Sequence, residues 1–148
     1  MGTSFDKVID LALLEINDYK LDKLFNQSQQ GFQTYCDGFL ISAIPNFVRC
    51  KQDLSYDAST RAFVSELTNL EQSILADFWV IQWFTKEVQD ATSIANVLQI
   101  SSAFSTHSPA SSLKEKGTYL NYLREKVMQK INYYLISDVD DIPHFNDW

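Results

Sequence analysis

The sequence has 148 residues, a length typical of one domain, and 45% of them are hydrophobic, which is enough to form a packed core. Its formal net charge of −7 argues against a nucleic-acid reader, because such proteins neutralise phosphates with clustered Lys and Arg. Aromatic residues make up 14% of the chain, and large aromatics often anchor protein interfaces, so the composition favours protein partners.

The first amphipathic helix is expected to begin after Ser4. Its apolar residues recur at helical spacing and form one stripe: Phe5, Val8, Ile9, Ala12 and Ile16. Asn17 and Asp18 then indicate a break. Residues 19–25 fit either a short second helix or an ordered loop.

A second strong helical pattern covers residues 28–51, with Pro45 inside it. Since proline removes a backbone hydrogen bond, we expect a kink near residues 41–45. Cys36 and Cys50 would lie in this same helix, with their Cα atoms ~21 Å apart at the usual helical rise. A disulfide between them is therefore not expected, which favours a reducing compartment.

Residues 52–66 are rich in turn formers and predict a structured loop, which could include a short strand pair. Thr68 and Glu71 have the spacing of a capping box, so a helix should start there and run to about Asp90. Its middle, residues 78–84, is apolar nearly all round. Such a helix is either central in the fold or covered by a neighbouring subunit.

Thr92 is expected to cap a shorter helix over residues 93–100. After a Ser-rich stretch, Ser108 and Pro109 indicate the start of a long helix that reaches Ile136. Three tyrosines, Tyr119, Tyr122 and Tyr133, lie off its apolar stripe. The residues expected to face inward are Leu113, Leu120, Leu123, Val127, Ile131 and Tyr134.

Charge is most polarised near the carboxyl end. Residues 111–136 contain five basic and two acidic side chains, a net +3, while residues 137–148 contain four Asp and no Lys or Arg. The basic residues fit either a solvated helix face or a contact with an acidic neighbour, and the possible subunit contacts are Lys126, Lys130 and Tyr133.

The last twelve residues form a predicted extended tail, in which large apolar groups alternate with acids. Docking onto another chain would use these groups well, whereas folding back or disorder are the alternatives. The candidate partner-binding residues are Asp138, Asp140, Asp141, Ile142, Phe145 and Trp148.

No pattern of catalytic residues is apparent. The four glycines form no phosphate-binding loop, and two histidines (His107 and His144) with two cysteines do not supply a zinc site. The carboxylates Glu66, Glu71 and Asp77 have no feature that separates them from surface groups. No apolar run is long enough to cross a membrane. We therefore expect a protein that is not an enzyme and has no cofactor or metal.

Together these patterns predict an all-α fold. An irregular bundle of four to five helices would cover residues 1–136, and the acidic-aromatic tail would cover residues 137–148. We find no repeat or linker that divides the bundle further.

The sequence resembles small helical head–tail connector (adaptor or neck) proteins of tailed bacteriophages, over most of its length. The residues that carry this resemblance are Thr3–Leu13, Asn17–Leu21, Leu67–Ala76, Trp83, and Ser108 leading into the long Leu/Tyr helix.

The resemblance implies a structural virion protein that forms a homo-oligomeric ring, commonly a dodecamer, between the portal protein and a stopper or tail protein. Such a ring lines the channel through which DNA passes without sequence-specific binding. Location in the neck of the virion, and in the host cytoplasm during assembly, would follow. The tail would then dock onto the portal. The competing hypothesis is a small regulatory or inhibitor protein that binds one host or phage enzyme.

Overall fold

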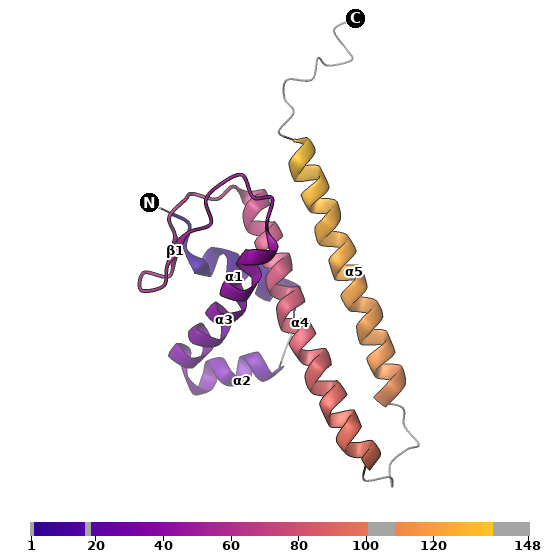
Figure 1. The fold of residues 1–148 in the computed structure, drawn as a ribbon. Coiled ribbons are helices and arrows are strands. Elements are labelled where there is room, and N and C mark those ends of the chain that lie inside the picture. Colours follow the sequence, from indigo (N-terminus) through magenta and orange to yellow (C-terminus); the bar gives the residue numbers. More distant parts are fainter. Residues whose placement is uncertain (1, 17–18, 101–108, 138–148) are drawn as a thin grey trace, which may run out of the picture.

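The structure is a computed structural model that describes the backbone of residues 2–16, 19–100 and 109–137. Within these ranges it is mostly helical, which confirms the expected all-α class (Figure 1). The predicted tail lies outside the described residues, apart from Ser137. The elements are α1 (Phe5–Glu15), α2 (Tyr19–Gln27), α3 (Gln29–Ala43), a 3-10 turn (Ile44–Asn46), β1 (Tyr56–Asp57), β2 (Ala62–Phe63), α4 (Asn69–Ile100) and α5 (Pro109–Ile136).

Helix α1 begins where the sequence predicts. The Ser4 hydroxyl accepts a hydrogen bond from the Asp6 N–H at 3.2 Å and so satisfies one free donor of the first turn. The predicted stripe is buried from Phe5 to Ala12. The segment after the break is helix α2, and its Phe25 ring packs edge-on against Phe32 of α3, 5.3 Å between centroids.

Helix α3 ends earlier than predicted. Ser28 caps its start, but the helix stops at Ala43 and does not reach Lys51. Pro45 lies in the 3-10 turn that follows, because it has no N–H to continue the α-helical ladder. Cys50 is therefore not in the same helix as Cys36, so the prediction that one helix contains both cysteines is wrong; both thiols are free.

The loop after α3 contains the suggested strand pair. Strands β1 and β2 are antiparallel, with Tyr56 opposite Phe63. The amino-terminal segment joins this hairpin: Thr3 and Phe63 bond through their backbones, and the Thr3 hydroxyl accepts from the Leu67 N–H at 2.8 Å. The hairpin is thereby fixed next to the starts of α1 and α4.

Helix α4 starts with the predicted capping box. The Glu71 N–H donates to the Thr68 hydroxyl at 3.2 Å, and the Thr68 N–H donates to Glu71 Oε1 at 2.8 Å. The helix runs to Ile100, so the predicted end at Asp90 and the separate helix capped by Thr92 are both wrong. Residues 84–100 contain no Gly or Pro, and a Thr cap contributes only about 1 kcal/mol, too little to interrupt a continuous helix.

Helix α4 is the centre of the fold. It contacts α1, α3 and α5, and Figure 1 shows α3 and α5 on opposite sides of it. Trp79 is fully buried, and its indole N–H donates to the Cys36 carbonyl at 2.9 Å. Of the two explanations for the apolar middle of α4, the central position is therefore confirmed for residues 78–81.

Helix α5 packs along α4 by the predicted inward face. Its buried side chains are Leu120, Leu123, Val127, Ile131 and Tyr134. The side chain of Leu113 lies outside the described part of the chain. The helix begins at Pro109 and ends at Ile136, as the sequence predicts.

Candidate protein-interaction site

Two carboxylates are buried where α4 meets its neighbours. Glu71 is 1% exposed and Asp77 is 3% exposed, whereas Glu66 lies at the surface. The sequence interpretation that Glu71 and Asp77 resemble surface groups is therefore wrong. Buried carboxylates require partners, and both organise the attachment of α5.

Glu71 receives donors from three parts of the chain. The Tyr134 hydroxyl of α5 donates to Oε2 at 2.7 Å, and the Gln52 amide of the loop donates to Oε1. Burial raises the pKa of Glu71, but the hydrogen bonds from Thr68, Tyr134 and Gln52 outweigh it and hold the pKa below its ordinary value. Glu71 is therefore an anion that joins the start of α4 to the end of α5.

The groups around Glu71 remain protonated. The Cys50 thiol lies 3.5 Å from Glu71 Oε2, and burial followed by the nearby carboxylate raises its pKa. Burial likewise raises the pKa of the Tyr134 hydroxyl. A thiol is a nucleophile only as the thiolate, so this cluster is suited to holding helices together and not to attacking a substrate.

Lys51 fixes the carboxyl end of α5. Its N–H donates to the Tyr134 hydroxyl at 2.9 Å, and its ammonium donates to the Tyr134 carbonyl at 3.1 Å. The Ser137 hydroxyl donates to the same carbonyl at 2.8 Å. A cation at the last carbonyls of a helix also matches the helix dipole. The carboxyl end of α5 is therefore tied to the loop after α3.

Asp77 is the second attachment point of α5. Its Oδ2 lies 2.7 Å from the Lys130 ammonium, which also donates to the Ser73 hydroxyl at 2.8 Å. Lys126 lies 3.9 Å from Asp77 Oδ1 and 3.5 Å from Glu15 of α1. Burial and then the proximity of Asp77 raise the pKa of Glu15. Three helices therefore meet around two lysines and two carboxylates.

The predicted subunit-contact residues have different positions. Lys126 and Lys130 turn toward carboxylates of their own chain, so neither is simply part of a solvated face. Tyr133 is 66% exposed. A contact of these three with another subunit stays a prediction. The partner-binding candidates from Asp138 to Trp148, and both histidines, lie outside the described residues.

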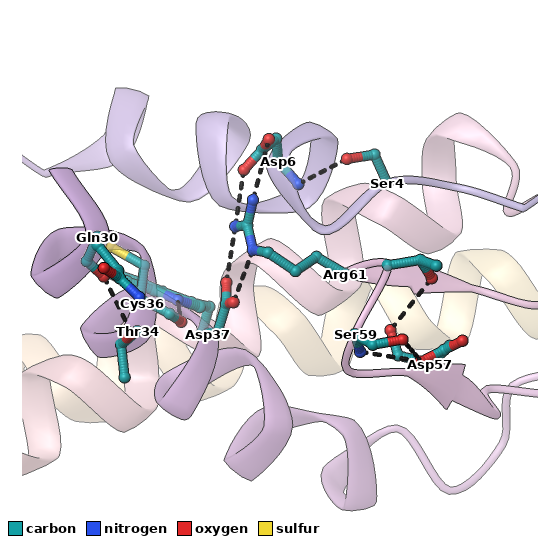
Figure 2. A network of polar contacts seen from close by, with 11 residues as sticks. Ser4, Asp6, Gln30, Thr34, Cys36, Asp37, Asp57, Ser59 and Arg61 are labelled. Atoms are coloured by element: carbon teal, nitrogen blue, oxygen red, sulfur yellow. Dashed lines mark hydrogen bonds and ion pairs between the residues drawn. The ribbon is translucent and has the colours of Figure 1, made fainter.

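A third polar cluster joins the hairpin to α1 and α3 (Figure 2). The Arg61 guanidinium contacts Asp37 at 2.7 Å through Nε and Asp6 at 2.8 Å through Nη2. The hydrogen bonds to Asp37, followed by those to Asp6, raise the pKa of Arg61. The Arg61 backbone has a φ of 53°, a left-handed conformation that is unfavourable for side chains other than Gly. The ion pairs of Arg61 with Asp6 of α1 and Asp37 of α3 hold the residue in this backbone conformation.

The outer face of α5 carries exposed large apolar side chains. Tyr119 and Tyr122 stack with ring centroids 6.0 Å apart, and Tyr119 also meets Phe84 of α4 edge-on. Exposed aromatic and Met side chains on one element are typical of protein-contact surfaces. The exposed members are Tyr119, Tyr122, Met128, Tyr133 and Ile136.

Comparison with protein families, with curated proteins and with solved structures found no match. In the part of the chain that the structure describes, no three His, Cys, Asp or Glu residues are grouped so that they could hold a metal ion. Among the described helices, none combines the length and apolar character that a membrane span requires.

Proposed function

We propose that this chain is a structural virion protein, a head-to-tail connector that forms a ring between the portal and the tail or stopper. Support comes from the resemblance carried by residues 3–13, 17–21 and 67–76, and from the acidic-aromatic tail. The observation that carries the proposal is the fixed root of this tail, where Lys51 and Ser137 both donate to the Tyr134 carbonyl.

A rigid root favours docking of a short linear segment. Binding such a segment costs conformational entropy, and the cost falls when one end already has a fixed position. Ile142, Phe145 and Trp148 provide apolar anchors at a spacing of three, while the intervening Asp residues select a basic surface. The portal is the partner that this proposal assigns to the tail.

The charge of the chain supports a position beside DNA without binding to it. A net charge of −7 disfavours adhesion of the phosphate backbone, so DNA would slide past an acidic wall. Two of the lysines of α5, Lys126 and Lys130, are paired with Glu15 and Asp77 of the same chain, which reduces their attraction for the phosphate backbone.

The experiment is a binding assay between the full chain and the portal protein encoded in the same genome. Deleting residues 138–148, or substituting Asp for both Phe145 and Trp148, should abolish co-purification and cross-linking with the portal protein. The matched control is Val64→Asp in the hairpin, a 65% exposed apolar position, which should bind like the wild type. Undiminished binding of the truncated chain would refute the role of the tail, and a genome without a portal gene would refute the connector proposal.

A further inference from the structure

The Asp77 carboxylate is buried without regular hydrogen bonds. It is 3% exposed, and among the described residues no donor meets either of its oxygens with hydrogen-bond geometry. Lys130 pairs with it at 2.7 Å, but the hydrogen bond of that ammonium goes to the Ser73 hydroxyl. Buried carboxylate oxygens are normally hydrogen-bonded, because burial removes the water that would otherwise solvate them. Asp77 therefore still requires a hydrogen-bond donor.

Two other helices present charged or titratable groups to this carboxylate. Glu15, at the end of α1, lies within hydrogen-bonding reach of Asp77. From α5, the Lys126 ammonium lies 3.5 Å from Glu15 Oε1 and 3.9 Å from Asp77 Oδ1. Tyr122 lies near Lys126, and Lys130 completes the set that the described residues bring to this junction. Two carboxyl groups and two lysines therefore meet here.

A proton on Glu15 provides the donor that Asp77 lacks. The O–H of a protonated carboxyl group donates a charge-assisted hydrogen bond to a carboxylate, and such bonds are short and roughly twice as strong as neutral ones. We propose that Glu15 and Asp77 form a proton-binding pair, in which Glu15 takes up a proton as the pH falls and then donates a hydrogen bond to Asp77. The junction thus contains a contact between α1 and α4 that forms on proton binding.

The positions of the lysines assign the proton to Glu15. Asp77 has both Lys130 and Lys126 close to it, at 2.7 and 3.9 Å. Glu15 pairs only with Lys126 among the described residues, at 3.5 Å. Since nearby cations favour the ionised form of a carboxyl group, Asp77 remains the anion. Burial, followed by the hydrogen bond and charge of Asp77, raises the pKa of Glu15, which agrees with this assignment.

Proton binding changes the contacts of Lys126. While Glu15 is ionised, the Lys126 ammonium contacts both carboxylates and links α5 to α1 and α4. Once Glu15 is protonated, Lys126 keeps only its longer contact, with Asp77. The Lys126 side chain is 34% exposed, so its ammonium is then free to turn toward solvent. The link between α1 and α5 is thus exchanged for a direct bond between α1 and α4, in the free chain and without portal, tail or DNA.

The test is an NMR titration of the full chain, with the side-chain carboxyl groups of Glu labelled with carbon-13 and the ammonium groups of Lys with nitrogen-15. The Glu15 carboxyl group should titrate above its ordinary pKa of 4.5. The Lys126 ammonium signal should change with the same midpoint, whereas the signal of exposed Lys114 should not. A Glu15 midpoint at or below 4.5, or a Lys126 signal that does not follow Glu15, would overturn the proposal.

Two substitutions distinguish a shared proton from burial alone. Asp77→Asn removes the anion that accepts from Glu15 and should lower the Glu15 midpoint, whereas burial alone would leave that midpoint unchanged. Lys126→Met removes the cation that favours ionised Glu15 and should raise the midpoint, while the matched control Lys114→Met should not. Because Lys126 is partly exposed, its variant decides the question if Asp77→Asn does not fold. A Glu15 midpoint that a folded variant of either residue leaves unchanged would refute the pair.

Discussion

The Tyr134 hydroxyl donates to the Glu71 carboxylate at 2.7 Å across 63 residues of sequence. Glu71 lies in the first turn of α4 and Tyr134 in the last turn of α5. The bond therefore joins the start of α4 to the end of α5 in this antiparallel helix pair. The same carboxylate completes the capping box with Thr68, so one side chain serves both the start of a helix and its contact with another.

Removing the Tyr134 hydroxyl should destabilise the domain. Tyr134→Phe deletes the donor to a buried carboxylate and the acceptor of the Lys51 N–H. Hydrogen bonds to charged groups contribute about 1.5–3 kcal/mol, and we expect a loss of that size in the free energy of unfolding, measured with urea. Tyr133→Phe removes a hydroxyl from an exposed neighbour and should be nearly neutral. Equal effects of the two substitutions would contradict the role given to this bond.

The acid dependence of stability should reflect Glu71. Its pKa is lower in the folded chain than the ordinary value of 4.5, so its anion stabilises the fold above that pH. This contribution is lost as the pH falls through the folded pKa. The difference in unfolding free energy between wild type and Glu71→Gln should therefore be largest near neutral pH and shrink in acid. A difference that stays constant below pH 4.5 would show that charge is not its origin.

Glu15 should change the free energy of unfolding in the opposite direction as the pH falls. Its pKa is raised by burial and by Asp77, so the folded chain takes up this proton more readily than the unfolded one. The contribution of Glu15 to stability should increase as pH falls through the raised folded pKa toward the unfolded value. Unfolding of Glu15→Gln, measured over the same pH series, should lack this increase. An unchanged pH profile in that variant would refute the assignment.

Loss of Lys130 should leave the buried Asp77 carboxylate with only its longer contact to Lys126, at 3.9 Å. Lys130→Ala removes the ammonium 2.7 Å from Asp77, which is 3% exposed. Breaking a buried pair from one side costs about 3–5 kcal/mol, and we expect the lower end because Lys130 is partly exposed. Lys114→Ala, at an exposed position of the same helix, is the control. Thermal unfolding should show a large fall in Tm for the first variant and little change for the second.

Two substitutions at Arg61 separate the effect of backbone strain on stability from the effect of the side-chain ion pairs. Arg61→Ala loses the pairs with Asp6 and Asp37 and keeps a Cβ at a φ of 53°. Arg61→Gly loses the same pairs but relieves the strain, worth about 1 kcal/mol. Both variants should be less stable than wild type, with the Gly variant above the Ala variant in urea unfolding. A Gly variant less stable than the Ala variant would exclude strain as a significant factor.

Helical faces were predictable and helix ends were less so. The stripe from Phe5 to Ala12, and the inward residues of α5 from Leu120 to Tyr134, follow from periodicity because burial requires one apolar side. The end of α3 at Ala43 and the continuity of α4 past Thr92 depend on small local energies. Pro45 ends α3 although the apolar helical pattern continues beyond it. No Gly or Pro lies beside Thr92, so α4 continues through that position.

The sequence predicted only part of the hydrogen bonding and ion pairing of Glu71 and Asp77. The capping box identified the bond between Glu71 and Thr68, but its bonds to Gln52 and Tyr134 join residues far apart in the chain. Asp77 had one available signal, its position inside the apolar run from Ile74 to Ile81. A carboxylate there must be buried, and the lysines four residues apart on α5 are its natural partners. Their pairing still depended on how the helices align.

A force applied to the carboxyl terminus along the α5 axis loads the α4–α5 contact in shear. Because Lys51 and Glu71 both form hydrogen bonds with Tyr134, we expect the last turn of α5 not to detach before the rest of the helix. The buried side chains of α5 from Tyr134 back to Leu120 must then separate from α4 together, so the force is transmitted to α4. A pull on the end of α5 would therefore be shared between α5 and α4.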